Sequence, residues 1–394
     1  MAPFNMLANV SKAFHRHPLS LFSYTDYGRH MAAAAELFER ITNRYGKPTF
    51  GITHTTIDGK AVGITEETLL EKPFCDLIHF KKSSGKSQPK LLLVAPMSGH
   101  HATLLRGTVE GLLPFADVYI TDWLDARYIP LSAGEFTLED YIHYTIEFIR
   151  HLGPDVHVMA VCQPSVPVLI AAAVMNDAKD PKTPHSMTLI GGPIDTRINP
   201  TKVNATAEQR PLAWFKQNVI TRVPFNYPGF MRRVYPGFLQ LTGFMTLNLD
   251  RHINAHIDLF KHLVVGDGDS ARAHKKFYDE YLSVTDLPAE FYLDCIEKVF
   301  QKHELPKGEF RYEGERVNPA AISKTALLTL EGELDDISGV GQTEAAQNLC
   351  KNLPAKMKHH HLQKGVGHYG IFNGRKYREH VVPIIVDFMH AHNK

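Results

Sequence analysis

The spacing of hydrophobic and polar positions changes along the chain, and the change separates an amino-terminal part from the rest. Apolar residues between Ala34 and Tyr45 recur at steps of three and four, which predicts a helix over residues 28–45. Shorter apolar segments then alternate with turn-forming residues such as Asp58 and Gly59. This second pattern predicts strands over 50–56, 61–64 and 74–81.

Continuous apolar runs begin at Leu91 and are typical of strands buried on both faces of a parallel sheet. Helical segments lie between several of these runs. The clearest begins at Thr137, because Asp140 three residues later completes a capping pattern. The alternation predicts an α/β fold with a doubly wound, mostly parallel sheet. Its strands are expected at 91–95, 118–121, 156–161, 187–190 and 326–330, with a weaker one at 357–362.

One interval is too long for an ordinary crossover connection, since about 135 residues separate the runs at 187–190 and 326–330. It is rich in aromatic residues and contains Tyr-Pro-Gly-Phe at 227–230 and again at 235–238, which predicts two similar turns. We therefore expect three parts. They are an N-terminal helical extension (1–48), a core (49–194 and 325–394) and an inserted cap or lid domain (195–324).

Composition narrows the class of protein. Of 394 residues, 44% are hydrophobic, which is enough to fill a large core, and the formal net charge is +1. A near-neutral chain has no overall attraction to nucleic acid or to an anionic membrane. The amino end lacks the apolar stretch of a signal peptide, and the run at 166–175 is too short for a membrane span. These features predict a cytoplasmic protein.

The four cysteines are scattered and form neither a zinc-type spacing nor a disulfide framework (Cys75, Cys162, Cys295, Cys350). Cys162 stands out because the strand predicted at 156–161 runs directly into it, and an apolar helix follows from Ser165. This is the layout of a nucleophile elbow, with Ala160 and Pro164 in the two small-residue positions. A thiol there would lie at the positive end of a helix dipole. The alternative is a buried structural cysteine.

Two further strand ends carry the residues that would complete a catalytic triad. Asp335 follows the strand at 326–330, and His368 lies in a glycine-rich loop after the last strand. The order nucleophile, acid, histidine is that of α/β-hydrolases. Asp336 and Asp195 remain alternatives for the acid.

Other histidines compete for the role of His368. His100 and His101 follow the first buried strand and are the nearest rivals. The triplet 359–361 suggests a metal site, but neighbouring residues of a strand point to opposite faces, so we expect no metal.

The loop after the first buried strand is expected to help form an oxyanion hole. In this fold one N–H comes from that loop and the other from the residue after the nucleophile. The candidates are Ser98 or Met97, together with Gln163. An ordinary turn at Ser98 is the alternative.

Four motifs resemble those of intracellular poly(3-hydroxybutyrate) depolymerases, at 160–168, 96–109, 331–339 and 365–372. The Cys-Gln-Pro-Ser elbow is distinctive, since most esterases have serine there. The resemblance implies an α/β-hydrolase with Cys162, Asp335 and His368 as its triad and no cofactor. It further implies a cytoplasmic enzyme on storage granules that hydrolyses the polyester to 3-hydroxybutyrate oligomers and monomer. A cysteinyl thioester would also permit transfer of the acyl group to coenzyme A.

An aromatic cap suits an uncharged polyester, although most of its aromatic residues are expected to form the cap's own core. The candidates for substrate binding are Trp123, Phe230, Tyr235 and Phe238. A polyester synthase-like acyltransferase or a thioesterase would share the elbow, and a non-catalytic granule-coat protein would share the fold. Self-association into a homo-oligomer is compatible with all these alternatives.

Overall fold

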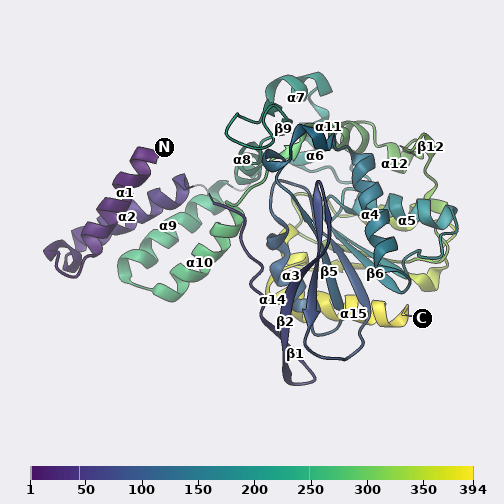
Figure 1. Ribbon diagram of the computed structural model, residues 1–394, viewed down its shortest axis with the longest axis horizontal. Helices are drawn as coiled ribbons and strands as arrows, with labels where there is room; N and C mark the ends of the chain where they lie inside the picture. Colours follow the sequence, from purple (N-terminus) through teal and green to yellow (C-terminus); the bar gives the residue numbers. More distant parts are fainter. Residues whose placement is uncertain (1, 44, 248, 394) are drawn as a thin grey trace. The chain divides into compact units, whose positions relative to one another are not determined.

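A computed structural model describes residues 2–43, 45–247 and 249–393 (Figure 1). The chain divides into two compact units. The helical unit comprises residues 1–49 and 238–284, and the sheet unit comprises residues 50–237 and 285–394. Residues 238–284, expected as part of one cap, thus group with the amino-terminal helices, while 195–237 and 285–324 belong to the sheet unit.

The sheet unit contains a nine-stranded sheet in the order β1-β2-β3-β5-β4-β6-β7-β13-β14. The first three strands pair antiparallel, as does β3 with β5, and all the other pairs are parallel. The strands are β1 (His54–Ile57), β2 (Lys60–Lys72), β3 (Cys75–Lys82), β4 (Lys90–Val94), β5 (Asp117–Trp123), β6 (Val156–Val161), β7 (Ser186–Ile190), β13 (Ala326–Gly332) and β14 (Lys358–Gln363).

The central strands are buried along their whole length, as their continuous apolar runs predict. Two pairs of helices pack beside the sheet, α4 (Leu138–Leu152) with α5 (Ser165–Asp177) and α3 (Arg106–Leu112) with α15 (Val382–Ala391). Figure 1 shows the first pair on one side of the sheet and the second on the other. The α/β-hydrolase fold predicted from the sequence is confirmed.

Local signals in the sequence explain where these helices begin and end. Thr137 and Asp140 form the predicted capping box at the start of α4, and Gly153 ends that helix with a positive φ of 81°. Pro164 caps α5, whose first turn needs no N–H from it.

The remaining parts of the sheet unit are short elements that follow β7 or the helical unit along the chain. The expectation of twin Tyr-Pro-Gly-Phe turns is wrong for the second copy. Residues 227–230 form a turn, but Tyr235 ends a strand and Gly237 begins a helix. The short elements of the sheet unit are α6 (Lys202–Glu208), α7 (Leu212–Asn218), β8 (Thr221–Arg222), β9 (Arg233–Tyr235), β10 (Leu287–Pro288), α11 (Ala289–Asp294), α12 (Glu304–Lys307), β11 (Arg311–Tyr312), β12 (Glu315–Arg316), α13 (Ala345–Leu349) and α14 (Gly374–Lys376).

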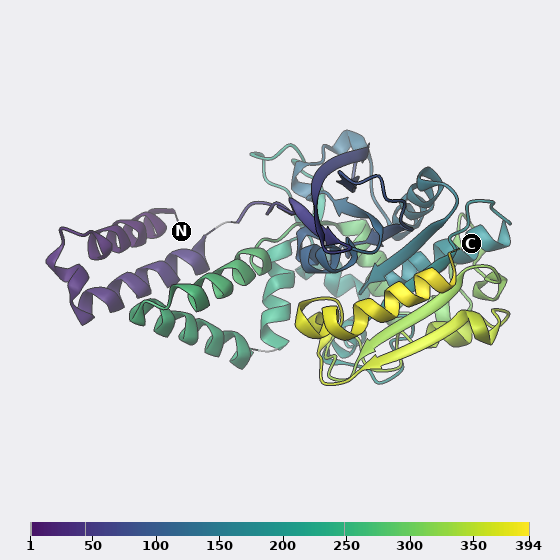
Figure 2. The same cartoon turned by 90° about the horizontal axis from the view of Figure 1, so that it is seen from below.

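In the helical unit, α1 packs on α2, α2 on α9, and α9 on α10. The predicted helix at 28–45 corresponds to α2 and begins at the Thr25 cap. Across the described ranges, none of the helices is both long and apolar enough to cross a membrane. The helices are α1 (Ala2–Arg16), α2 (Asp26–Thr42), α8 (Gly237–Leu247, whose first residue belongs to the sheet unit), α9 (Leu249–Val265) and α10 (Gly268–Tyr281). Figure 2 shows the α1–α2 hairpin from a second side.

Candidate active site

The connection between β6 and α5 is a sharp turn with Cys162 at its centre. Cys162 has a positive φ of 70°, a left-handed conformation that is costly for a residue with a side chain. Its backbone N–H donates to the carbonyl oxygen of Ile190 on the neighbouring strand, with N and O 2.7 Å apart. Cys162 is half-buried, whereas the other three cysteines are buried. The turn therefore has the geometry that the elbow pattern predicts.

The loop after β7 passes close to the turn at Cys162, and two glycines in this loop make the close approach possible. A Cβ atom added to Gly192 would lie 2.1 Å from Cβ of Ser165, and one added to Gly191 would lie 3.2 Å from the His368 ring. A side chain at either position would push against the elbow or the histidine. Two consecutive glycines are therefore required between the predicted nucleophile and its partners.

The structure brings His368 and Asp335 together at the carboxyl ends of the strands. Nδ1 of His368 lies 2.8 Å from Oδ2 of Asp335, and the two side chains are only 5% and 1% exposed. The other oxygen of Asp335 accepts hydrogen bonds from the N–H groups of Ile337 and Ser338, each at 2.9 Å. The carboxylate is thus fixed on both sides, and the Nε2 atom of the imidazole remains for Cys162.

Burial and two neighbouring groups determine the charge of His368. Burial lowers its pKa, but the charges of Asp335 and Cys162 and hydrogen bonds to both raise it, and the resulting pKa lies well above the ordinary value. Burial raises the pKa of the Cys350 thiol to about 12, and that of Cys295 still further. These two thiols are protonated at neutral pH, whereas Cys162 has a basic partner.

The two alternative acids lie elsewhere. Asp195 forms a two-fold ion pair with Arg197, at 2.8 and 2.7 Å, and this pairing outweighs burial and lowers its pKa. Asp336 is exposed. Of the three carboxylates considered, Asp335 is therefore the one that is hydrogen-bonded to His368. The rival histidines, His100 and His101, are buried in the loop after β4.

The candidate oxyanion residues come from two loops that meet. The backbone N–H of Met97 donates to Oε1 of Gln163 across 3.4 Å, so the loop after β4 and the residue after Cys162 are neighbours. Ser98 is half-buried, and Gly99 next to it turns with a φ of 90°. The carbonyl oxygen of Gly99 accepts a hydrogen bond from the backbone N–H of Thr285, with N and O 2.8 Å apart, and this bond fixes the loop.

The four candidates for substrate binding differ in burial and belong to different parts of the chain. Trp123 is a core residue, since it is 5% exposed, donates to the Ala95 carbonyl and stacks on Tyr141. Tyr235 is half-buried and stacks on Tyr292 with ring centres 3.9 Å apart. Phe230 is exposed in the sheet unit and Phe238 is exposed in the helical unit. The aromatic rings that contact His368 are those of Tyr369 and Phe372.

The sequence analysis missed the residues that hold the loop at Gly192 in place beside the site. The Thr343 hydroxyl bridges the N–H and carbonyl of Gly192, at 2.8 and 3.0 Å. Glu331 in turn accepts from the N–H groups of Gly341, Thr343 and Glu344 at 2.7–2.9 Å. A glutamate within a buried strand was the signal, because a buried carboxylate requires hydrogen-bond donors.

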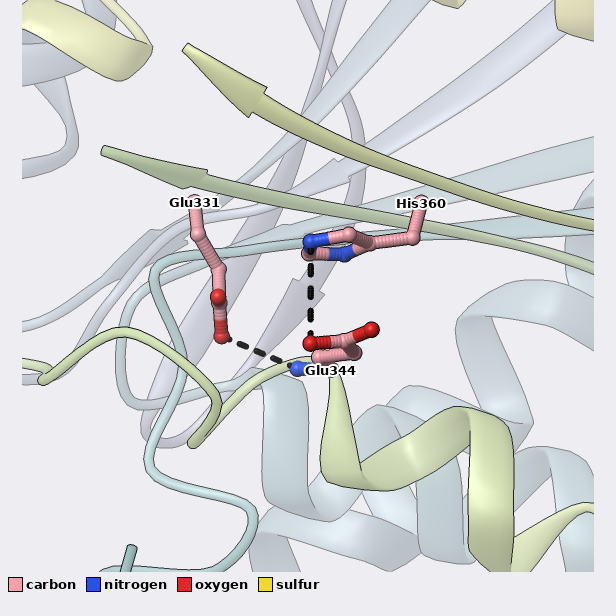
Figure 3. A group of neighbouring side chains, drawn as sticks. All are labelled: Glu331, Glu344 and His360. Atoms are coloured by element: carbon pink, nitrogen blue, oxygen red, sulfur yellow. Dashed lines mark hydrogen bonds and ion pairs between the residues drawn. The ribbon is translucent and has the colours of Figure 1, made fainter. Parts of the chain in front are cut away.

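Glu331 also belongs to a group whose atoms could hold a metal ion, together with Glu344 and His360 (Figure 3). Three backbone donors already occupy its carboxylate. His360 bonds to the Thr329 hydroxyl at 3.0 Å through Nδ1 and lies 3.8 Å from Glu344 through Nε2. These interactions give the group a structural role, namely holding the loop at 341–344 against the sheet.

Comparison with known proteins identifies the family. A family model described as "PHB de-polymerase C-terminus" matches residues 191–393, slightly more than half of the chain. This range contains Asp335 and His368, while Cys162 lies before it. No curated protein matches the chain.

Solved structures resemble the chain only distantly. A thermophilic esterase from Thermogutta terrifontis is 14% identical, with 87% of this chain and 98% of that chain covered and a TM-score of 0.42. A monoacylglycerol lipase from Paleococcus ferrophilus is 15% identical (78% and 96% covered, TM-score 0.44). A carboxylesterase from Nitrososphaera gargenis is 12% identical (83% and 99%, TM-score 0.45). The assignment therefore rests on the family model: the chain belongs to the PHB depolymerase family and is a carboxylic ester hydrolase.

Proposed function

We propose that the protein is an intracellular depolymerase that hydrolyses poly(3-hydroxybutyrate) through a thioester on Cys162. The observation that carries the proposal is the buried His368–Asp335 pair, whose remaining ring nitrogen serves the cysteine at the turn after β6. A cysteine beside a histidine that a carboxylate orients is the arrangement of an activated nucleophile. Membership of the family supports a polyester substrate.

The chemistry follows from these positions. His368 holds the proton given up by the Cys162 thiol, and Asp335 stabilises the charged imidazole. The sulfur attacks an ester carbonyl of the polymer, and the C–O bond breaks as His368 returns the proton to the leaving alkoxide. Water, losing a proton to the same histidine, then attacks the thioester, and the C–S bond breaks to release the carboxylic acid and free Cys162 beside the charged His368. No cofactor takes part.

In this mechanism the developing oxyanion is held by backbone N–H groups of Gln163 and of Met97 or Ser98. Each donor of this kind commonly contributes about 3–4 kcal/mol to lowering the barrier. The Met97 N–H bonds to the Gln163 side chain at 3.4 Å, a long hydrogen bond. A substrate carbonyl would replace the amide oxygen of Gln163 there.

The proposal also includes how polymer reaches the site and where in the cell the protein works. The segment from Phe225 to Met245 is proposed to control the access of polymer, with Phe230, Tyr235 and Phe238 as contact residues. The protein is proposed to work in the cytoplasm on the surface of storage granules.

Purified protein incubated with amorphous poly(3-hydroxybutyrate) granules tests the proposal. We expect soluble 3-hydroxybutyrate and short oligomers, and none with Cys162→Ala. A parallel incubation with coenzyme A distinguishes hydrolysis from acyl transfer, since transfer gives 3-hydroxybutyryl-CoA. Polymer growth from 3-hydroxybutyryl-CoA would show a synthase instead. Absence of any reaction on granules and on soluble esters would show a non-catalytic protein.

A further inference from the structure

The helical unit exposes an apolar surface that the proposed chemistry does not use. Its residues lie on α1, on the turn that follows and at the start of α2, and we call them the N-terminal apolar patch. Each member is about half exposed or more, and Leu19 and Leu21 reach 87% and 85%. The patch consists of Met6, Leu7, Val10, Phe14, Leu19, Leu21, Phe22, Tyr24 and Tyr27.

The side chains on α1 form a single stripe. At about 100° per residue, Met6, Leu7, Val10 and Phe14 fall within an arc of about 100°. Ala8, which is buried, lies on the opposite side of the helix. Because α1 packs on α2, the helix presents its buried small residue to α2 and its large apolar residues to the outside. A helix with apolar residues on two opposite sides is typical of one that is covered on both.

The patch is held in a fixed arrangement. A Cβ atom on Gly28 would lie 1.7 Å from the carbonyl oxygen of Phe22, so the turn at Leu21–Tyr24 lies directly on the first turn of α2. Thr25 caps that turn by accepting from the Gly28 N–H at 3.0 Å. The rings of Phe14 and Phe22 are 5.9 Å apart, which joins the stripe on α1 to the turn.

The size of the patch suits a protein interface. Its nine side chains expose on the order of 1,000 Å², more than the few hundred Å² of a usual apolar patch and comparable to the ~800 Å² per partner of a stable interface. At the edge of the patch, Asp26 and Arg29 form an exposed ion pair, and a rim with both signs of charge is self-complementary about a two-fold axis.

We infer that the N-terminal apolar patch is the interface of a homodimer, in which a second copy of the chain covers it with the same surface. The ridged surface of α1 fits the helix of another copy by ridges-into-grooves packing. A polymer surface has no such grooves and would be met by a smooth apolar face. This inference is independent of the proposed chemistry.

Sedimentation equilibrium of the full-length protein at micromolar concentration tests the inference. We expect the wild type at twice the mass of one chain and Leu7→Asp/Val10→Asp at the mass of one chain. Both residues are exposed within the chain, so a melting curve and hydrolysis of a soluble ester should show that the variant is folded. The matched control is Leu69→Asp, an exposed leucine of the sheet unit that should leave the dimer intact.

A monomeric wild type, or a variant that remains dimeric, would overturn the inference. If the wild type is monomeric and pellets with polyester granules while the double variant does not, the patch is a polymer-binding surface instead. Should the variant fail to fold, hydrogen exchange of the wild type over a dilution series replaces it. Dimerisation through the patch requires protection of residues 6–27 to fall on dilution, and concentration-independent exchange there would contradict it.

Discussion

The sheet unit buries histidines at both ends of its parallel strands, and the pKa values of two of them, His157 and His368, move in opposite directions. His157, near the amino end of β6, is fully buried and hydrogen-bonded to the Ser186 hydroxyl at 2.7 Å, and burial lowers its pKa to about 4. His368, beyond the carboxyl ends, is buried almost as completely. There the charge of Asp335 outweighs burial, and the pKa of His368 lies well above its ordinary value.

The difference shows that the partner of a buried histidine, more than its burial, determines its charge. A hydroxyl accepts or donates a hydrogen bond with either form of the ring, so desolvation decides and the neutral form prevails. A carboxylate with 1% exposure favours the charged form strongly. Chemistry that needs a charged imidazole is therefore expected at the carboxyl ends, where open α/β sheets generally bind their ligands.

The largest effect should come from removing the thiol at the carboxyl end. Cys162→Ala is expected to lower the rate of ester hydrolysis by about 10⁴–10⁶-fold, because losing one member of a triad disables the whole unit. The melting temperature should change little. Cys350→Ala is the control, since that buried thiol has a raised pKa and should be dispensable for activity. Residual activity above a tenth of wild type would rule out Cys162 as the nucleophile.

The next effect concerns the carboxylate that distinguishes His368 from His157. Asp335→Asn should reduce kcat/KM by about 10⁴-fold, because the amide favours the wrong imidazole tautomer and cannot stabilise the positive charge. Asp195→Asn, which breaks the ion pair with Arg197, should cost much less. Steady-state kinetics on a soluble ester measures both. A greater loss for Asp195→Asn would move the acid to the loop after β7.

The sequence predicted the fold correctly where a pattern of residues fits only one kind of secondary structure. Strands buried on both faces need continuous apolar runs, so the central strands could be predicted directly, whereas the triad of Cys162, Asp335 and His368 stays a prediction. Gly191 and Gly192 were visible as a pair, but their role depends on how closely Ser165 and the His368 ring approach them. That distance is a property of the packed loops and leaves no mark on the local sequence.

Aromatic residues were the least predictable part of the candidate site. Trp123 and Phe230 were both candidates for substrate binding, yet Trp123 lies in the core and Phe230 is 48% exposed. The grouping of 238–284 with the amino-terminal helices likewise depends on contacts between distant segments, such as the ring contact of His30 with Phe260. Burial of this kind follows from tertiary structure and not from periodicity.

A pH titration of stability sharpens the contrast between the two histidines. In the unfolded chain His157 binds a proton below about pH 6.5, whereas in the folded chain it does so only below about pH 4. As the pH is lowered from 6.5 to 4, the free energy of unfolding should therefore fall by up to about 3 kcal/mol. His368 has the opposite sign: its contribution is present below pH 6.5 and is lost as the pH rises through its raised pKa.

Urea unfolding of the wild type and His157→Gln at several pH values measures the first contribution. Glutamine can still bond to Ser186 but does not titrate, so the variant's curve should be flatter between pH 4 and 6.5. Parallel curves would mean that His157 titrates alike in both states.

The smallest effect tests whether an exposed aromatic residue matters only to hydrolysis of the polymer. Phe230→Ser should lower the rate on granules several-fold and leave hydrolysis of a short soluble ester and the melting temperature unchanged. Phe115→Ser, at a similarly exposed phenylalanine of the sheet unit, is the control and should change neither rate. Equal losses on the two substrates would show that Phe230 supports the fold.

The left-handed backbone of Cys162 sets a limit on how this protein can be improved. A residue with a side chain at φ 70° costs about 1–2 kcal/mol relative to glycine, so the fold would gain stability if the thiol were given up. Directed evolution for heat resistance, run without a test for activity, would therefore be drawn toward glycine at this position. A screen that couples survival of heating to ester cleavage would instead keep the strained cysteine and find its gains elsewhere.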